Sequence, residues 1–327
     1  MITERDYEQA TASMTALREA IDGVIVGHER VVEAALVGML GSGNVLLEGI
    51  PGLGKTLLVR ALAAALGLRF SRIQFTPDLM PADIVGTDII TEEDGRRSFS
   101  FAPGPVFAHV VLADEINRAT PKTQSALLEA MEERTVTVGT KTYPLEEPFV
   151  VLATQNPIEM EGTYPLPEAQ IDRFLLKATV EYPSIDQLVA IAERNTEGAG
   201  VVLPQPVASG DDILRARRVV REMPVAEELR RYVARLVMAT HPSNALAPAC
   251  VRDFVEYGAS PRGAIALVLA AKARAFLAGQ ANVRRSDIEE MFVLALQHRM
   301  ILNFRGEAEG VRVAGVLDEV WKATSVT

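Results

Sequence analysis

The segment from Asn44 to Leu57 reads NVLLEGIPGLGKTL. It begins with a short apolar run that indicates a β-strand, and it ends where residues 55–66 take up the periodicity of an amphipathic helix. The loop between them has the pattern G-x-x-x-x-G-K-T, from Gly49 to Thr56. Glycines allow consecutive backbone N–H groups of such a loop to point at phosphate oxygens, and the amino end of the helix adds partial positive charge. The segment therefore predicts a strand, a phosphate-binding loop and a helix in succession.

Two side chains of this loop have distinct expected roles. Lys55 is expected to bridge the β- and γ-phosphates of ATP, and the hydroxyl of Thr56 is expected to ligate Mg²⁺. The loop backbone supplies the remaining contacts to ATP or ADP. The predicted nucleotide-binding residues of the loop are Gly49, Pro51, Gly52, Leu53, Gly54, Lys55, Thr56 and Leu57.

Up to residue 184 the chain alternates short β-rich runs with helical runs. The expected strands cover residues 44–48, 70–75, 109–113, 149–154 and 175–181, and the clearest helices cover 55–66 and 121–133. Several strands are continuously apolar, as strands of a parallel sheet covered on both faces require. We therefore expect an α/β fold over residues 1–184, with the αβα parallel sheet of a P-loop NTPase.

From residue 185 onward the β signal disappears and helical runs follow one another. Helices are expected over residues 185–196, 211–223, 226–240, 262–278, 287–300 and 310–322. Ser209 and Ser286 each precede an acid by three residues, the capping-box spacing that marks the start of a helix. This pattern predicts a small, all-α second domain over residues 185–327.

Polar side chains stand where two of the apolar strands end. Asp114 and Glu115 follow one strand, and Asn156 follows the next. The carboxyl ends of parallel strands are the ligand-facing edge of such a sheet, so Asp114 is expected to hold the hydration shell of Mg²⁺ and Glu115 to activate the attacking water. Asn156 would donate to the γ-phosphate or that water. The alternatives are a solvated acidic turn and an ordinary turn asparagine before Pro157.

Two hairpin-like ribbons interrupt the α/β pattern. The first joins residues 88–91 to 98–101 through Asp94-Gly95, a dipeptide that favours a tight turn, and the second joins residues 135–138 to 141–143 through Gly139. They are either surface ribbons without a further role or elements that contact a partner.

Composition excludes several classes of protein. The 33 Lys and Arg residues against 43 Asp and Glu give a net charge of -10, which argues against nucleic-acid binding and against anionic lipid. A single cysteine, Cys250, permits neither an intrachain disulfide nor a multi-cysteine metal site and fits a reducing compartment. The apolar stretch 263–271 is shorter than the roughly 20 residues of a membrane-spanning helix. We expect a cytoplasmic protein with no membrane contact.

Five further motifs carry a resemblance to a known family. They are FAPGPVF at 101–107, LADEINRA at 112–119, QSALLEAM at 124–131, ATQNP at 153–157 and LPEAQIDRF at 166–174. With the phosphate loop, they resemble the MoxR branch of the AAA+ ATPases. The ribbons are similar to those of the helix-two-insert proteins, which include magnesium-chelatase ATPase subunits and MCM helicases. The resemblance implies Mg²⁺-dependent ATP hydrolysis by an AAA+ domain with a four-helix lid.

The resemblance also implies roles for several residues. Arg173 matches the arginine finger that a neighbouring subunit inserts at the γ-phosphate, although an ion pair with Asp172 or Glu168 is the alternative. Arg262 matches sensor 2, which would join the lid to ATP on the phosphate loop. Val26 and Gly27 match the backbone region that lies against adenine, and Arg118 is either a second residue acting across subunits or a structural ion pair.

The expected partners follow from the same resemblance. They are further copies of the chain in a ring, most simply a hexamer, and a client protein, for which a von Willebrand A-type domain is the candidate. Hydrolysis would then drive remodelling, maturation or metal-cofactor insertion in that client. The alternatives are an MCM-like motor that translocates nucleic acid and a nucleotide-gated scaffold without catalysis, against which the intact Glu115 argues.

Overall fold

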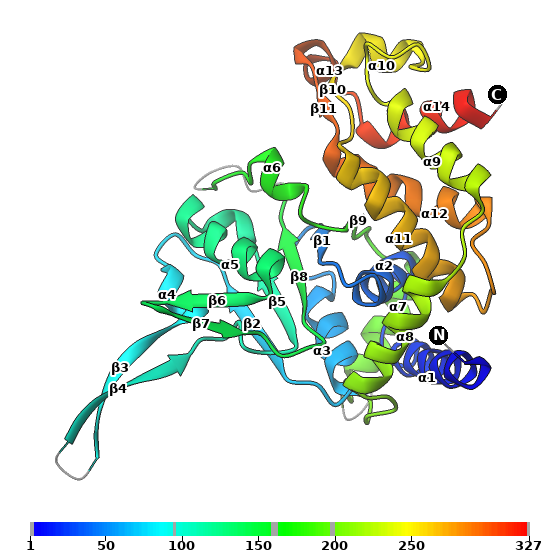
Figure 1. Cartoon of the computed structure of the whole chain (residues 1–327). Helices are drawn as coiled ribbons and strands as arrows, with labels where there is room; N and C mark the ends of the chain where they lie inside the picture. Colours follow the sequence, from blue (N-terminus) through cyan, green and yellow to red (C-terminus); the bar gives the residue numbers. More distant parts are fainter. Residues whose placement is uncertain (1–2, 94–95, 158–162, 197–199, 326–327) are drawn as a thin grey trace.

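The computed structural model describes residues 3–93, 96–157, 163–196 and 200–325. A five-stranded sheet lies at its centre with helices on both faces, and a mostly helical region lies beside it (Figure 1). The strand order is β2 (Phe70–Gln74), β5 (Val110–Asp114), β8 (Val150–Gln155), β1 (Val45–Glu48) and β9 (Leu176–Thr179). All neighbouring pairs are parallel. All five expected strands are therefore confirmed, as is the α/β class.

Apolar residues of the strands are buried on both faces of the sheet. Along β5, Val110 and Leu112 belong to one buried cluster and Val111 and Ala113 to the other. The first cluster includes residues of α1 (Glu4–Asp22), α2 (Glu29–Leu40) and α3 (Lys55–Ala65), and the second includes residues of α5 (Pro121–Glu133). This double burial is why these strands read as continuously apolar.

The six helices expected after residue 185 all form. They are α7 (Ile185–Thr196), α8 (Gly210–Glu222), α9 (Glu227–Ala239), α11 (Pro261–Leu277), α12 (Arg285–Leu296) and α14 (Val313–Ser325). The short helices α10 (Ala249–Phe254) and α13 (Phe304–Ala308) and the antiparallel strands β10 (Val255–Tyr257) and β11 (Ile301–Leu302) also occur there. These last four elements are too short to give a periodic signal.

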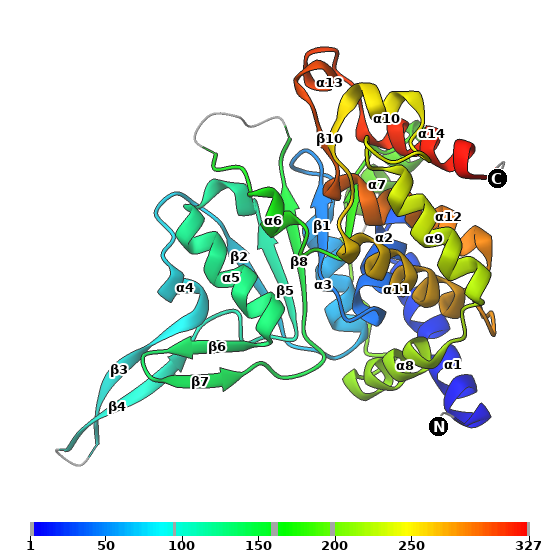
Figure 2. The ribbon, with the colours of Figure 1, turned by 45° about the horizontal axis from the view of Figure 1, so that its top comes forward.

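The larger buried cluster joins the sheet to the helical region. It contains residues of α1, α2 and one sheet face together with residues of α8, α9, α11, α12 and α14. Helix α1 lies directly against α8, although the two are far apart in the sequence (Figure 2). The expected division of the chain at residue 184 stays a prediction, because this core continues across it.

One of the two predicted helix caps is confirmed. Ser209 caps α8, because its Oγ accepts from the N–H of Asp212 at 3.3 Å, while its own N–H donates to Asp212 Oδ2 at 2.9 Å. The prediction at Ser286 is wrong, because α12 begins at Arg285, two residues before the expected start, and the N–H of the capping residue Arg284 donates to Asp287 Oδ2 at 2.7 Å. Asp287 is buried against Arg274, 2.6 Å away, and this fixed carboxylate sets the start of the helix.

The two predicted ribbons are longer than expected. The first consists of β3 (Gly86–Glu93) and β4 (Arg96–Pro103) after the short helix α4 (Pro81–Val85), and it projects from the body (Figure 1). The second consists of β6 (Thr135–Val138) and β7 (Lys141–Pro144). The expected turn at Asp94-Gly95 lies outside the described residues. No described helix is both long enough and apolar enough to cross a bilayer.

The two serines give a test of the caps. We expect Ser209→Ala to lower the free energy of unfolding by about 1 kcal/mol, since it removes a cap that holds an amide of the first turn. Ser286→Ala is the matched control and should cost nothing, because Ser286 lies inside the helix. Urea unfolding of both variants measures the difference, and equal losses would contradict the assignment of the caps.

Candidate active site

The phosphate loop follows β1 and runs into α3. Gly52 and Gly54 have φ angles of +86° and +79°, and no other atom lies within 4 Å of the position that a Cβ would take on either residue. Backbone conformation rather than space therefore requires glycine at these two positions. At Gly49 the requirement is close approach, because a Cβ there would lie 2.9 Å from the carbonyl oxygen of Val180.

The ammonium group of Lys55 lies over this loop. It donates to the carbonyl oxygens of Gly49 and Ile50, at 2.5 and 3.2 Å. Desolvation lowers the pKa of Lys55, and the charges of Asp114 and Glu115 act in the opposite direction. The cation is thus positioned between the loop backbone and the two acids at the end of β5.

A pocket of about 470 Å³ adjoins the loop. Apolar side chains from four segments line it besides the loop itself, and they include Val26, Val31, Tyr182, Leu188, Ile191 and Val201. The structure thus places Val26, which the family resemblance sets against adenine, beside the phosphate loop. The neighbouring Gly27 has a φ of +72°, and a Cβ on it would lie 2.7 Å from the side chain of Gln187. Such a pocket suits an aromatic base next to the phosphate site.

Asp114 and Glu115 end β5 in a constrained geometry. Asp114 Oδ1 accepts a hydrogen bond from Thr154 Oγ1 at 2.6 Å, and its Oδ2 lies 2.6 Å from Arg72 Nη2. Glu115 has a φ of +57°, and its N–H donates to the same Thr154 hydroxyl at 2.8 Å. A left-handed conformation in a residue other than glycine costs energy and is concentrated at functional sites. Thr154 on β8 therefore sets the direction of both acids.

The Glu115 carboxylate has two described partners. Its Oε2 accepts from Gln74 Nε2 at 2.9 Å and from Arg118 Nη1 at 2.9 Å. Arg118 thus forms an ion pair inside the chain, one of the two alternatives that the sequence left open. Our sequence analysis missed Arg72, Gln74 and Thr154. The local signal for the first two was their polar character within the expected strand 70–75, which does not show which strand lies beside them.

Thr56 and Asp114 provide the donor types that Mg²⁺ prefers, a hydroxyl and a carboxylate. Thr56 lies in the first turn of α3, and Asp114 is nearly buried at the end of β5. Among the described residues no group of three or more His, Cys, Asp or Glu side chains could hold a metal by itself. The donor set therefore fits an ion that is bound jointly by the protein and by phosphate oxygens. Asn156, at the end of β8 on the same edge of the sheet, is also buried.

Arg173 and Arg262 lie together at the opposite edge of the sheet. Both contact Glu132 at the end of α5: Arg173 Nε is 3.1 Å from its Oε2, and Arg262 Nη2 is 2.9 Å from its Oε1. They line a second pocket of about 280 Å³, to which Asn44 at the start of β1 also contributes. The sequence analysis expected ATP to join Arg262 to the phosphate loop of the same chain, but the structure places this arginine with Arg173 instead.

Comparisons with known proteins agree with this geometry. Residues 44–176 match the ATPase family associated with various cellular activities (AAA), and residues 248–320 match the AAA lid domain. Chaperone MoxR1 of Mycobacterium tuberculosis is 45% identical over 93% of this chain and 79% of its own. An uncharacterized protein of Bacillus subtilis, YeaC, is 42% identical over 94% and 93% of the two chains. The chain belongs to the MoxR family of AAA+ ATPases.

A solved structure supports the same conclusion. A candidate ATPase of Cytophaga hutchinsonii superposes with a TM-score of 0.91 at 39% identity, over 98% of this chain and 96% of its own. The AAA+ fold and the family resemblance expected from the sequence are thereby confirmed. A MoxR-family ATPase binds nucleotide and hydrolyses ATP, and the geometry of the phosphate loop and of the acids after β5 suits this activity.

The apolar pocket of this MoxR-family ATPase gives a test of base binding. We expect Leu188→Asp to weaken ATP binding at least about tenfold, because it places a charge where an apolar wall faces the base. Val189→Asp is the control, since Val189 is half-exposed on the same helix and does not line the pocket. Calorimetry with ATP and with inorganic triphosphate separates the cases: a loss that is equal for both ligands would contradict a base pocket.

A second test concerns the carboxylate at the end of β5. Glu115→Gln removes the proton acceptor but keeps the size of the side chain, so ATP hydrolysis should fall at least about 100-fold while ATP affinity is retained. Glu129→Gln on the exposed face of α5 is the control. Steady-state phosphate release measures the rate, and a Glu115→Gln variant with normal turnover would remove Glu115 from the chemistry.

Proposed function

We propose that this ATPase works as a ring in which every ATP molecule is bound between two subunits. The observation that carries the proposal is the position of Arg173 and Arg262. The N–H of Leu175, two residues after Arg173, donates to the carbonyl oxygen of Asn44, which directly precedes β1. The phosphate loop, in contrast, follows the other end of β1. The four residues of β1 place these two positions about 13 Å apart along the strand. Arg173 thus lies near the opposite end of β1 from the phosphate loop of its own chain, and Arg262 contacts the same Glu132 beside it, so in the ring both would reach the phosphate loop of a neighbour.

In the proposed site one subunit supplies the phosphate loop and the acids, and its neighbour supplies the arginines. Lys55 binds the phosphates, and Glu115 accepts the proton of the water that attacks the γ-phosphorus. Asn156 orients that water or the γ-phosphate. Arg173 and Arg262 of the neighbour stabilise the charge that develops on the phosphate oxygens. Mg²⁺, held by Thr56 and Asp114, would neutralise phosphate charge.

We further propose that hydrolysis remodels or matures a client protein. The name of the relative Chaperone MoxR1 supports a protein client. The first ribbon offers a contact element, because Ile90 and Phe99 face each other across β3 and β4 and are 65% and 77% exposed. Assembly as a hexamer, a client with a von Willebrand A-type domain, and metal-cofactor insertion belong to this proposal through the family resemblance.

The alternative of a nucleic-acid motor has less support. The net charge of -10 opposes binding to a polyanion. On the first ribbon the guanidinium of Arg97 lies 3.2 Å from Glu92, so its charge is compensated within the ribbon. Hydrolysis stimulated by DNA and weakened steeply by salt would favour the motor over the client-directed ATPase.

Mixed rings test the shared site. Arg173→Ala and Lys55→Ala should each hydrolyse ATP at least about tenfold more slowly than the unchanged protein. An equimolar mixture should regain activity, because a Lys55→Ala subunit still offers its arginines to an Arg173→Ala neighbour with an intact phosphate loop. Phosphate release is measured with light scattering on the same samples.

The outcome depends on assembly as well as activity. Specific activity of the unchanged protein should rise with protein concentration as oligomers form. A mixture that assembles fully but stays inactive would contradict the placement of Arg173 in a neighbour's site. Constant activity in a persistent monomer would contradict the ring itself.

A further inference from the structure

A largely buried polar network joins Arg173 to the helical region, in which α11 carries Arg262. Its centre is Arg299 in the short 3-10 helix η2 (Gln297–Arg299), which follows α12. We propose that Arg299, Asp172 and Ser260 are positioning residues, which hold Arg173 and Arg262 in one fixed arrangement and make Arg173 move with the helical region that carries Arg262. The inference rests on the shared site proposed above, and it assigns a role to three residues that the proposed chemistry does not use.

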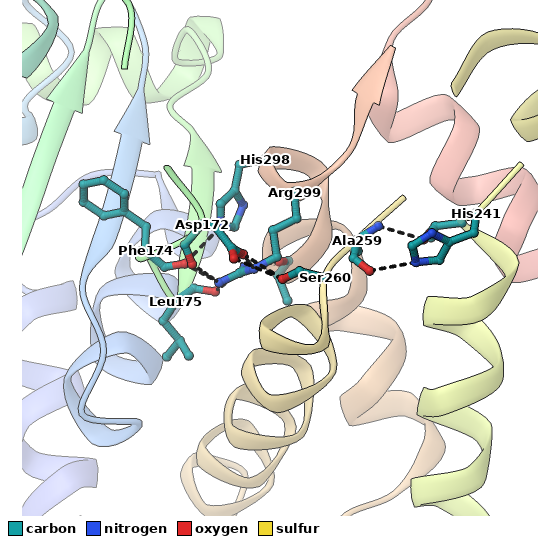
Figure 3. A network of polar contacts seen from close by, with 10 residues as sticks. Asp172, Phe174, Leu175, His241, Ala259, Ser260, His298 and Arg299 are labelled. Atoms are coloured by element: carbon teal, nitrogen blue, oxygen red, sulfur yellow. Dashed lines mark hydrogen bonds and ion pairs between the residues drawn. The ribbon is translucent and has the colours of Figure 1, made fainter. Parts of the chain in front are cut away.

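Arg299 binds the backbone on both sides of Arg173. Its Nη2 donates to the carbonyl oxygens of Asp172 and Phe174, at 3.0 and 2.6 Å, and its Nη1 donates to that of Leu175 at 3.2 Å (Figure 3). Its Nε donates to the Asp172 carboxylate at 2.8 Å. The side chain of Arg299 is only 3% exposed. A rigid planar group with four such bonds restricts the direction from which the Arg173 side chain leaves the backbone.

The Asp172 carboxylate extends this network to Arg262. The hydroxyl of Ser260 donates to it, at 3.0 Å from Oδ2 and 3.2 Å from Oδ1 (Figure 3). Ser260 precedes α11, yet its side chain makes no capping bond to that helix. Its hydroxyl therefore serves the contact with Asp172, and Arg262 follows two residues later on the first turn of α11.

Two neighbours of Arg299 reinforce the attachment. His298 Nε2 lies 3.0 Å from the carbonyl oxygen of Phe174, and Gln297 Nε2 donates to that of Lys177 at 2.7 Å. All three residues of η2 thus bind the segment 172–177, which leads from Arg173 into β9. A rotation of α12 and η2 therefore has to carry this segment with it.

Glu132 contacts both of the arginines that the network positions. Arg173 and Arg262 come from different elements, but each contacts one oxygen of the same carboxylate. Two guanidinium groups that bind the two oxygens of one carboxylate suit a compact anion with several oxygens. A buried ion pair contributes little net stability, because desolvation offsets the attraction, so Arg299 is better explained by the geometry that it imposes.

Complementation in mixed rings tests the proposal. We expect Arg299→Lys, Asp172→Asn and Ser260→Ala each to lower kcat, Arg299→Lys by at least about tenfold, with KM for ATP changed less than about twofold. Mixing any of them with Lys55→Ala should restore activity, since the lesion lies on the arginine side of the shared site. Mixing any of them with Arg173→Ala should restore nothing, since both lesions then lie on the same side.

Control variants distinguish a loss of positioning from a loss of folding, and they show whether the positioning role or the shared site itself is wrong. Ser209→Ala removes another serine–aspartate contact of the helical region and should leave kcat unchanged. Ser260→Ala removes only one hydroxyl, so it still tests the positioning role if Arg299→Lys fails to assemble. Recovery of Arg173→Ala by Lys55→Ala, without recovery of the positioning variants, would overturn this inference alone. If Arg173→Ala itself is not recovered in full assemblies, the shared site fails instead.

Discussion

The parallel direction of the five strands is the constraint on which the site depends. Because neighbouring strands all run the same way, their carboxyl ends collect the phosphate loop after β1, the acids after β5 and Asn156 after β8 at one edge. The same constraint sends the segment before β9 to the opposite edge, beside Asn44. Arg173 cannot approach Lys55 of its own chain without breaking the pairing of β9 with β1. The division of labour between subunits in the proposed ring therefore follows from strand direction.

Within the phosphate edge, a single hydroxyl organises the acids. Thr154 donates to Asp114 and accepts from the N–H of Glu115, so it joins β8 to the end of β5 through both residues. The left-handed backbone of Glu115 is compatible with this pair of bonds and turns its side chain toward Gln74 and Arg118. Each acid is thus held by a cation or a polar group of an adjacent element. A carboxylate held in this way needs little reorganisation when a phosphate and a water occupy the site.

Much of the fold and of the phosphate site could be predicted from local patterns. The glycine loop, the apolar strands and the acids after β5 all depend on a few consecutive residues, and their positions agree with the structure. Arg72 and Gln74 were missed because their contact with the acids requires β2 to lie next to β5, a pairing that no local pattern records. The cap at Ser286 was misplaced because the carboxylate of Asp287 is fixed by Arg274, thirteen residues earlier in the chain. The position of Arg262 depends on how α11 packs on α2 and α8, and this packing involves residues far apart in the sequence.

That packing also limits how the helical region can respond to nucleotide. One buried cluster runs from the sheet through α1 and α2 into α8, α11 and α12, so closing this region onto the phosphate loop of the same chain would expose apolar surface. Smaller shifts that keep the cluster intact cost less, and they would be transmitted through η2 to the segment that carries Arg173. In the proposed ring the helical region would therefore act on the site of the neighbour. A change at one nucleotide would reach the next subunit through the arginines rather than through a lid closing within the chain.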